Sequence, residues 1–290
     1  MNGSGGVVRI LSDLHLGHPA TQVREVASLA PLLEGAAELW FNGDTFEEHG
    51  AESAERGREQ YQELLALCAA HGVRSRFLTG NHDPGIAAEG WVELRSGRIF
   101  VSHGDMILAD VAPWKPEFLE RRGAVRRLIR EYGEVESLER LWGRARLVEA
   151  ATLPDVEPKM GVGGKGYLWS AFWPPMRPFH ILHGWATMFR EAERFVERYR
   201  PGCEVFLFGH FHRPGVRERG GRIYCNTGAF MRSATPLMVE LEGDWMRVRG
   251  VHRDRHGNFC PTHALESFRI PSCPGIHDVI GFGAQLSRSM

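Results

Sequence analysis

Short apolar runs alternate with polar loops and amphipathic segments over the first hundred residues. Four of these runs predict buried strands, at 7–11, 38–41, 73–78 and 98–101. Helical periodicity predicts a helix at 20–33, after the first strand, and another at 52–70, after the second. This order of strands and helices indicates an α/β layer architecture, in which functional groups gather just past the carboxyl ends of the strands.

The pattern changes over residues 113–200, which are predicted to be mostly helical, with a Gly/Pro-rich break at 154–166. Strands then resume, and they are predicted at 204–208, 222–225, 237–241 and 246–251, the last two as a hairpin around Gly243-Asp244. We expect one α/β domain over residues 1–250 with a lid-like helical insertion at about 110–200. An extension of unknown role follows at 251–290.

Composition and charge are those of an ordinary globular protein of 290 residues. Thirty-five basic residues nearly balance 36 acidic ones, and a net charge of −1 disfavours a protein that grips nucleic acid along its length. Only Lys115, Lys159 and Lys165 are lysines, which is typical of a GC-rich genome. Between Arg121 and Arg146, however, arginines outnumber acids eight to four, and this local excess indicates a place for an anionic group.

The sequence also bears on location. It contains no apolar run of about 18 residues, and no basic segment followed by an apolar one near Met1, so we expect a protein that is neither exported nor membrane-spanning. The five cysteines are odd in number and never spaced as Cys-x-x-Cys, which suits a reducing compartment. A cytoplasmic protein, with peripheral membrane contact as an option, is the interpretation that follows.

Four polar clusters lie at the ends of predicted strands. They are Asp13-Leu-His15, Gly43-Asp44, Gly80-Asn81-His82-Asp83 and Gly209-His210-Phe-His212. Oxygen and imidazole nitrogen are ligands that divalent transition metals accept, and side chains two apart in an extended strand end point the same way. The combined chance expectation of the three rarer patterns is on the order of 10⁻⁴, so the set predicts a metal centre rather than unrelated structural histidines.

This ordered set, together with His103-Gly104, resembles the calcineurin-like metallophosphoesterases over roughly residues 7–250. The resemblance implies a four-layer α/β/β/α sandwich with two mixed sheets and a site for two divalent metal ions, with Mn, Fe or Zn suiting the ligands. It implies that Asp13, His15, Asp44 and His212 hold the first metal. Asp44 would bridge to the second, completed by Asn81, His103 and His210. His183-Gly184 is the alternative to His103, but it falls in a predicted helix.

The resemblance also implies catalytic and substrate-binding residues. His82 would lie beside the phosphate, with Asn81, as an electrophile or a general acid, and Asp83 would orient it. Arg213 follows the last histidine and would contact phosphate, although a surface ion pair accounts for it equally well. A hydroxide bound by both metals would attack phosphorus without a covalent enzyme intermediate.

One branch resembles the chain further, the UDP-2,3-diacylglucosamine pyrophosphatases of lipid A synthesis, through Asp-Leu-His-Leu-Gly, Gly-Asp-x-Phe and Gly-His-x-His-Arg-Pro. A phosphorylated small molecule or a nucleotide-sugar lipid is therefore the expected substrate. The aromatic segment 167–189 would suit acyl chains, or it forms a small satellite core. His82, where that branch often has Arg, and Asn226-Thr-Gly fit the wider family better. A nuclease of the same fold and a non-enzymatic metal-binding scaffold are the lesser alternatives.

The extension carries further candidate ligands at short intervals: His252, His256, Cys260 and His263, with Cys273 and His277 beyond. A structural zinc site is one interpretation. Gly257 and Pro261 break any single helix there, so a strand-and-coil extension packed on the sandwich is the favoured one.

Overall fold

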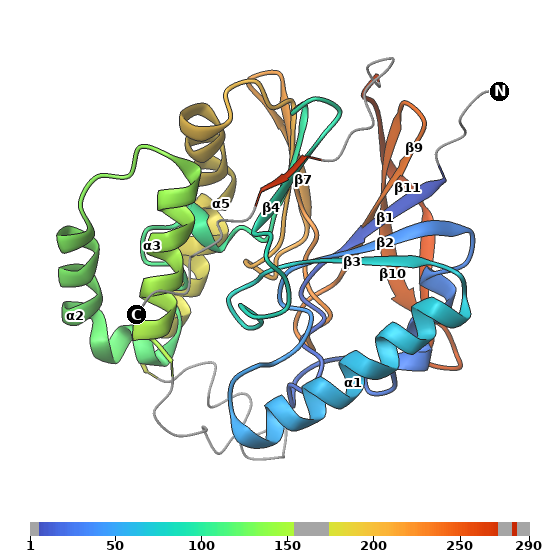
Figure 1. The fold of residues 1–290 in the computed structure, drawn as a ribbon, viewed down its shortest axis with the longest axis horizontal. Coiled ribbons are helices and arrows are strands. Elements are labelled where there is room, and N and C mark those ends of the chain that lie inside the picture. Colours follow the sequence, from blue (N-terminus) through green and yellow to red (C-terminus); the bar gives the residue numbers. More distant parts are fainter. Residues whose placement is uncertain (1–5, 154–173, 272–279, 283–290) are drawn as a thin grey trace.

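Two six-stranded sheets face each other in the computed structural model, which describes residues 6–153, 174–271 and 280–282 (Figure 1). The first sheet has the order β11-β10-β9-β1-β2-β3. Its strands are β1 (Val7–Leu11), β2 (Ala36–Asn42), β3 (Arg74–Leu78), β9 (Leu237–Glu242), β10 (Trp245–Arg253) and β11 (Phe259–Arg269). β1, β2 and β3 are parallel, and β9 to β11 are antiparallel, so the sheet is mixed.

The second sheet has the order β12-β4-β5-β6-β8-β7. Its strands are β4 (Trp91–Leu94), β5 (Ile99–Ser102), β6 (Val205–Phe208), β7 (Gly215–Arg219), β8 (Arg222–Asn226) and β12 (Ile280–Phe282). β5, β6 and β8 run parallel, and β4 and β7 are antiparallel to their neighbours. β4 and the edge strand β7 were not predicted, because β4 has only four residues and the exposed residues of β7 show little apolar pattern.

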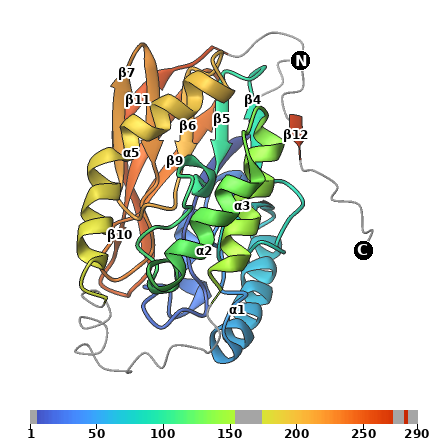
Figure 2. The ribbon, with the colours of Figure 1, turned by 90° about the vertical axis from the view of Figure 1, so that its left-hand side faces the viewer.

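Helices cover the outer face of each sheet, which completes four layers (Figures 1 and 2). The 3₁₀ helix η1 (Val26–Leu32) and α1 (Ala51–Ala70) pack on the first sheet around a core that includes Leu29, Phe41 and Leu64. On the second sheet lie α3 (Leu138–Ala151) and α5 (Arg177–Tyr199), with α2 (Pro116–Tyr132) packed on α3. The predicted mixed α/β sandwich is confirmed.

Between the sheets lies an apolar core from both inner faces. It contains Ile10, Trp40, Val101, Leu207 and Val239, each at most 2% exposed. Because β1, β2 and β3 are parallel in the first sheet and β5, β6 and β8 in the second, the carboxyl ends of these strands meet at one edge of this core. The packing thereby sets how closely the polar loops of the two sheets approach.

The helix predicted at 20–33 is only partly present, since regular helical structure is confined to η1. The residues before it bond to the loop after β8 instead. The Gln22 amide N–H donates to the Phe230 carbonyl, and the Gln22 side chain donates to Met231 and Ala234. Long-range hydrogen bonds therefore outweigh the local helical pattern.

The helical middle of the chain agrees with the prediction. The arginine-rich stretch forms two helices, because Gly133, at φ 78°, ends α2 and the Ser137 hydroxyl caps α3 by accepting from the Arg140 N–H. Trp185 and Phe189 on α5 pack against the core, whereas Phe179 is 65% exposed. Residues 167–173 of the predicted aromatic segment and the whole break at 154–166 lie outside the described residues.

The first part of the C-terminal extension belongs to the sandwich. β11 pairs with β10 along its length, and the predicted hairpin around Gly243-Asp244 is β9 and β10. The division into a domain, an insertion and an extension stays a prediction. No helix in the part of the chain that the structure describes has the length and apolar character needed to span a membrane.

The aromatic stack behind the second sheet should carry much of the stability. Phe206, 1% exposed, stacks on Phe195 of α5 with ring centroids 5.4 Å apart and on Phe208 at 5.0 Å. We expect Phe206→Ala to lower the free energy of unfolding by about 3–5 kcal/mol, because it leaves a cavity between sheet and helix. Urea denaturation measures this.

The control for that substitution is Leu147→Ala, since Leu147 on α3 is 48% exposed. We expect it to change the free energy of unfolding by less than about 0.5 kcal/mol. Equal effects of the two substitutions would contradict the assigned packing.

Candidate metal centre

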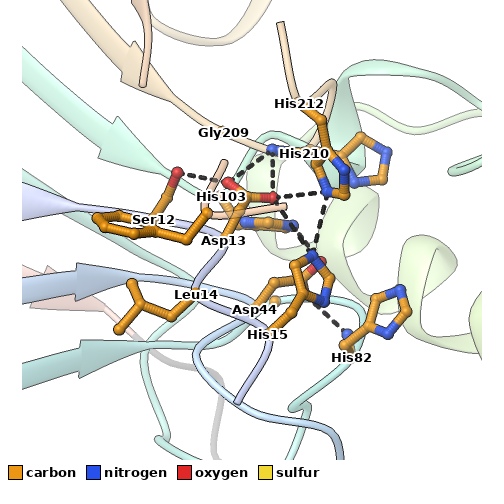
Figure 3. A network of polar contacts seen from close by, with 12 residues as sticks. Ser12, Asp13, Leu14, His15, Asp44, His82, His103, Gly209, His210 and His212 are labelled. Atoms are coloured by element: carbon orange, nitrogen blue, oxygen red, sulfur yellow. Dashed lines mark hydrogen bonds and ion pairs between the residues drawn. The ribbon is translucent and has the colours of Figure 1, made fainter. Parts of the chain in front are cut away.

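Loops that leave five strands carry the predicted ligand positions, and the six ligands labelled in Figure 3 lie together at one edge of the inter-sheet core. Asp13 and His15 follow β1, Asp44 follows β2, Asn81 follows β3, His103 follows β5, and His210 and His212 follow β6. All are buried except His212, whose side chain is 31% exposed. The structure therefore gathers side chains that lie up to 199 residues apart in the sequence.

Four of these residues form one tight group. The ligand atoms of Asp13, His15, Asp44 and His212 all lie within 4.8 Å of one another. The His15 Nε2 is 3.1 Å from the His212 Nε2, and the latter is 3.2 Å from a carboxylate oxygen of Asp13. Imidazole nitrogens and carboxylate oxygens converging on one point are a donor set that fits a divalent cation.

A second group adjoins the first through Asp44. The same Asp44 oxygen, Oδ2, lies 3.6 Å from the His15 Nε2 and 3.3 Å from the His103 Nε2. His103 Nδ1 donates to the Asn42 carbonyl at 3.0 Å, which leaves its Nε2 directed at Asp44. Asp44 therefore stands between the two groups, where a bridging carboxylate would lie.

His210 and Asn81 complete this second group. The rings of His210 and His103 lie 5.3 Å apart, and His210 Nε2 donates to the Val111 carbonyl at 3.0 Å, so its Nδ1 is left for a ligand. The Asn81 side-chain oxygen is buried and has no hydrogen-bond partner among the described residues. A buried acceptor without a partner is costly, and a bound cation would satisfy it.

One residue of the centre was missed by the sequence analysis. Glu47, 4% exposed, accepts from His15 Nδ1 through one carboxylate oxygen and from His82 Nδ1 through the other, both at 2.8 Å. The charged rings of His82 and His15 outweigh burial and hold the pKa of Glu47 well below its usual range. The carboxylate can only accept, so both Nδ1 atoms carry the proton. The sequence feature that could have identified Glu47 is that it is an acidic residue three positions after Asp44.

The Asp83 side chain bonds to the backbone rather than to the ring of His82. It accepts from the backbone N–H groups of Asp44, Thr45 and Gly80, and thereby joins the loop after β2 to the loop after β3. Glu47, and not Asp83, contacts the His82 ring. A catalytic role for Asp83 stays a prediction, and its hydrogen bonds place it as a support for the loops.

The buried charges shift one another's pKa values strongly. Burial would raise the pKa of Asp44, but the charged rings of His103 and His82 outweigh it and hold that pKa well below its usual range. Burial would lower the pKa of His15, but Glu47, Asp44 and Asp13 raise it to about 9. The carboxylates thus attract cations strongly, whether protons or metal ions.

The pKa values of His210 and Asp83 shift in the opposite direction to those of His15 and Asp44. Burial and the charge of His103 lower the pKa of His210 to about 3, so its ring is neutral, as a metal ligand must be. Burial and the neighbouring Asp44 raise the pKa of Asp83 to about 7.

The ligands are placed by left-handed backbone rather than by alternation along a strand. Asp13 (φ 55°), His15 (φ 49°), Asp44 (φ 51°), His210 (φ 68°) and His212 (φ 52°) all have positive φ. The expectation that the side chains at positions 13 and 15 converge through an extended strand end was wrong, because β1 ends at Leu11. Such conformations are unfavourable for non-glycine residues and cluster at functional sites.

Two glycines allow the loops to approach the carboxylates. A Cβ on Gly80 would overlap Oδ1 of Asp44, and a Cβ on Gly209 would overlap Oδ2 of Asp13 and the hydroxyl of Ser12. Ser12 contacts the Asp13 carboxylate and lies 2.5 Å from the Thr227 hydroxyl, which supports that ligand from behind. The glycines in these two motifs are therefore required for close contact with the ligands.

The other candidate residues have different surroundings. His183 is exposed on α5, whereas His103 is completely buried beside Asp44. Arg213 is exposed and its guanidinium lies over the ring of Trp185, 5.3 Å from the centroid. His252 and Cys260 face each other across β10 and β11.

The zinc interpretation of the extension finds no support in the described part of the chain. Among the described residues, two sets of at least three His, Cys, Asp or Glu have ligand atoms within 4.8 Å of one another: Asp13, His15, Asp44 and His212, and His15, Glu47 and His82. Neither includes a residue of the extension. Cys273 and His277 lie outside the described residues.

Comparison with known proteins shows the family of the chain. The family model described as "Calcineurin-like phosphoesterase" matches residues 7–214, which is more than half of the chain. The protein therefore belongs to the calcineurin-like phosphoesterase family. No curated protein matches it significantly.

Several solved structures resemble the chain weakly. Vacuolar Protein Sorting 29 from Cryptosporidium parvum is 13% identical, with a TM-score of 0.44, over 92% of this chain and 99% of that one. A predicted phosphoesterase from Streptococcus pneumoniae is 14% identical, with a TM-score of 0.36 and coverages of 96% and 98%. A dimetal phosphatase from Danio rerio is 10% identical, with a TM-score of 0.43 and coverages of 93% and 100%.

The contact between Gly80 and Asp44 can be tested by one methyl group. We expect Gly80→Ala to displace the Asp44 carboxylate and lower the bound metal per chain, as measured by elemental analysis after dialysis against Mn²⁺. Gly202→Ala is the matched control, because a Cβ there meets nothing within 4 Å. Full metal content in Gly80→Ala would show that the loop tolerates the displacement and that the assigned contact is unimportant.

Proposed function

We propose that the protein is a dinuclear metal-dependent phosphoesterase that hydrolyses a phosphate ester or a diphosphate bond. The observation that carries the proposal is the position of Asp44, one of whose carboxylate oxygens faces His15 in the first group of ligand atoms and His103 in the second. Family membership supports the reaction class. The complete ligand set argues against a non-enzymatic scaffold, in which ligands would be lost.

The donor set fits two divalent cations. Asp13, His15, Asp44 and His212 would hold the first, and Asp44, Asn81, His103 and His210 the second; manganese, iron and zinc all suit oxygen and imidazole donors. Such ions lower the pKa of a shared water and offset the charge that develops on phosphate oxygens. The net charge of −1 is consistent with this proposal, because the phosphate-binding charge would come from the ions.

His82 is the residue best placed to act on the leaving group. Its side chain is 25% exposed, so it lines the open part of the centre. Glu47 holds the Nδ1 proton, and Nε2 is the ring nitrogen left to face a substrate. A proton on Nε2 can be donated to the oxygen that leaves phosphorus, which is general acid catalysis by an imidazole held in one orientation.

Arg213 is a candidate phosphate contact. It follows the ligand His212 directly, and its guanidinium is held over the ring of Trp185, whose Nε1 donates to the Phe211 carbonyl at 2.8 Å. An arginine fixed by stacking can present two donors to a phosphate.

A narrower candidate function is that of a UDP-2,3-diacylglucosamine pyrophosphatase-like enzyme. One observation favours it: at the start of α5, the N-cap residue Met176 and the helix residues Phe179 and Leu182 are 56%, 65% and 57% exposed. Such side chains suit contact with acyl chains. Peripheral membrane contact and a cytoplasmic location are part of this narrower proposal.

The pair of histidines held by Glu47 gives a direct test of the mechanism. We expect Glu47→Gln to lower turnover by about 10–100-fold, because an amide oxygen accepts from one ring while its NH₂ group opposes the other. The measurement is kcat together with metal affinity. Glu48→Gln is the matched control, since Glu48 bonds to the Gly85 N–H instead. Equal turnover in both variants would contradict the role given to Glu47.

The proposed activity itself requires a panel of substrates. We expect the Mn²⁺-loaded protein to hydrolyse at least one of a phosphomonoester, a phosphodiester, a nucleotide-sugar diphosphate and UDP-2,3-diacylglucosamine, with release of phosphate or nucleotide as the readout. Asp44→Asn should lose this activity and weaken both metals, because it removes the charge shared between them.

The arms of the panel separate the candidate functions. Selective hydrolysis of the diacylated sugar nucleotide would support the lipid A assignment, and hydrolysis of nucleic acid would support a nuclease. Protein with two bound metals and no activity on any substrate would instead support a scaffold. An Asp44→Asn variant with full metal content and turnover would show that the bridging assignment is wrong.

A further inference from the structure

One buried arginine of the helical layer reaches the loops of the metal centre. Arg146 lies on α3, its side chain is 14% exposed, and its guanidinium donates to the Gly80 carbonyl at 2.7 Å. The same guanidinium pairs with Asp105, which is 1% exposed, and with Glu149, 3.1 Å away. A single side chain of α3 thus contacts both the loop at Gly80 and the segment at Asp105.

Each of those loops carries a candidate ligand of the second metal. Gly80 immediately precedes Asn81, and Asp105 follows His103 by two residues. Gly80 also packs directly against the Asp44 carboxylate. The position of the Gly80 carbonyl and that of the Asp105 carboxylate therefore affect where Asn81, His103 and Asp44 lie.

The remaining ligand of the second metal is also supported by residues between β5 and β6. The Val111 carbonyl accepts from His210, and the Trp114 ring lies 5.2 Å from the His210 ring. Val111 has φ 57°, an unfavourable value for a β-branched residue. By contrast, the first-metal residues His15 and Asp13 are supported by Glu47 and Ser12 of the sandwich.

We infer that Arg146 is a positioning residue that couples the helical layer to the second metal half-site. This inference rests on the proposed dinuclear site. The planar guanidinium spans a carbonyl and two carboxylates at once, which an ammonium cannot reproduce with the same geometry. Loss of the guanidinium should release the loops at Gly80 and Asp105 while leaving in place Asp13, His15 and His212, the first-metal ligands that are not shared with the second metal.

Arg146→Lys tests the inference, because it keeps the positive charge beside two buried carboxylates and removes only the planar guanidinium with its several donors. Metal-free protein is titrated with Mn²⁺, and binding is followed by calorimetry and by the electron paramagnetic resonance signal of a coupled manganese pair. We expect the second ion to bind at least about tenfold more weakly, with the first ion weakened by a clearly smaller factor through the shared Asp44 and the coupled signal lost.

Arg144→Lys is the matched control. Arg144 lies on the same helix and is also half-buried, but its charged and polar neighbours are Tyr199, Tyr132, Arg198 and Asp110. We expect it to bind both ions as the parent does. Two ions of parental affinity in Arg146→Lys would overturn the inference, whereas a parent protein that binds fewer than two ions would overturn the proposed function instead.

A measurement on the unmodified protein covers the case in which Arg146→Lys does not fold. Hydrogen–deuterium exchange is compared with and without Mn²⁺ over residues 142–149 of α3, which carry no candidate ligand. We expect Mn²⁺ to slow exchange there, because the ions fix the loops that Arg146 holds. Exchange in α3 that does not respond to Mn²⁺ would overturn the coupling.

Discussion

Burying two carboxylates side by side costs several kcal/mol unless opposite charge lies next to them, and Asp13 and Asp44 are both at most 1% exposed. The compensating imidazoles come from both sheets: His15 from the first, and His103 and His212 from the second. The strand ends of the two sheets must therefore lie next to each other. Asn42 holds them together, because its side-chain amide donates to the Ser102 carbonyl while its backbone carbonyl accepts from His103 Nδ1.

Strand ends and ligand motifs were predictable because they are local features. An apolar run followed by Asp-x-His, or by Gly-Asn-His-Asp, identifies both a strand and the loop beyond it, and the structure places every such loop at one edge. The contact between Glu47 and His82 was not predictable in this way, since nothing in the spacing of 35 residues says that the two side chains meet. The strands β4 and β7 were missed because β4 is short and β7 is exposed.

The arginine excess between positions 121 and 146 has several structural explanations. Arg121 donates to the carbonyls of Ala151 and Leu153, and Arg140 lies over the ring of Tyr132. Arg146 alone of these three reaches a loop of the metal centre. The local charge pattern therefore pointed to a segment that contacts the candidate metal centre, but it could not distinguish an arginine that supports ligand loops from one that would bind an anion.

The left-handed backbone of the ligands affects how the chain can change over evolution. Each non-glycine residue in this conformation costs roughly 1–2 kcal/mol relative to the right-handed one, and glycine would occupy positions 13, 15, 44, 210 and 212 with less strain. A lineage that no longer needed the metal centre would gain stability by giving up these side chains. Two effects would then favour loss of the ligands: the metal centre would no longer be under selection, and the backbone strain at these positions would be relieved. Such a loss would be difficult to reverse.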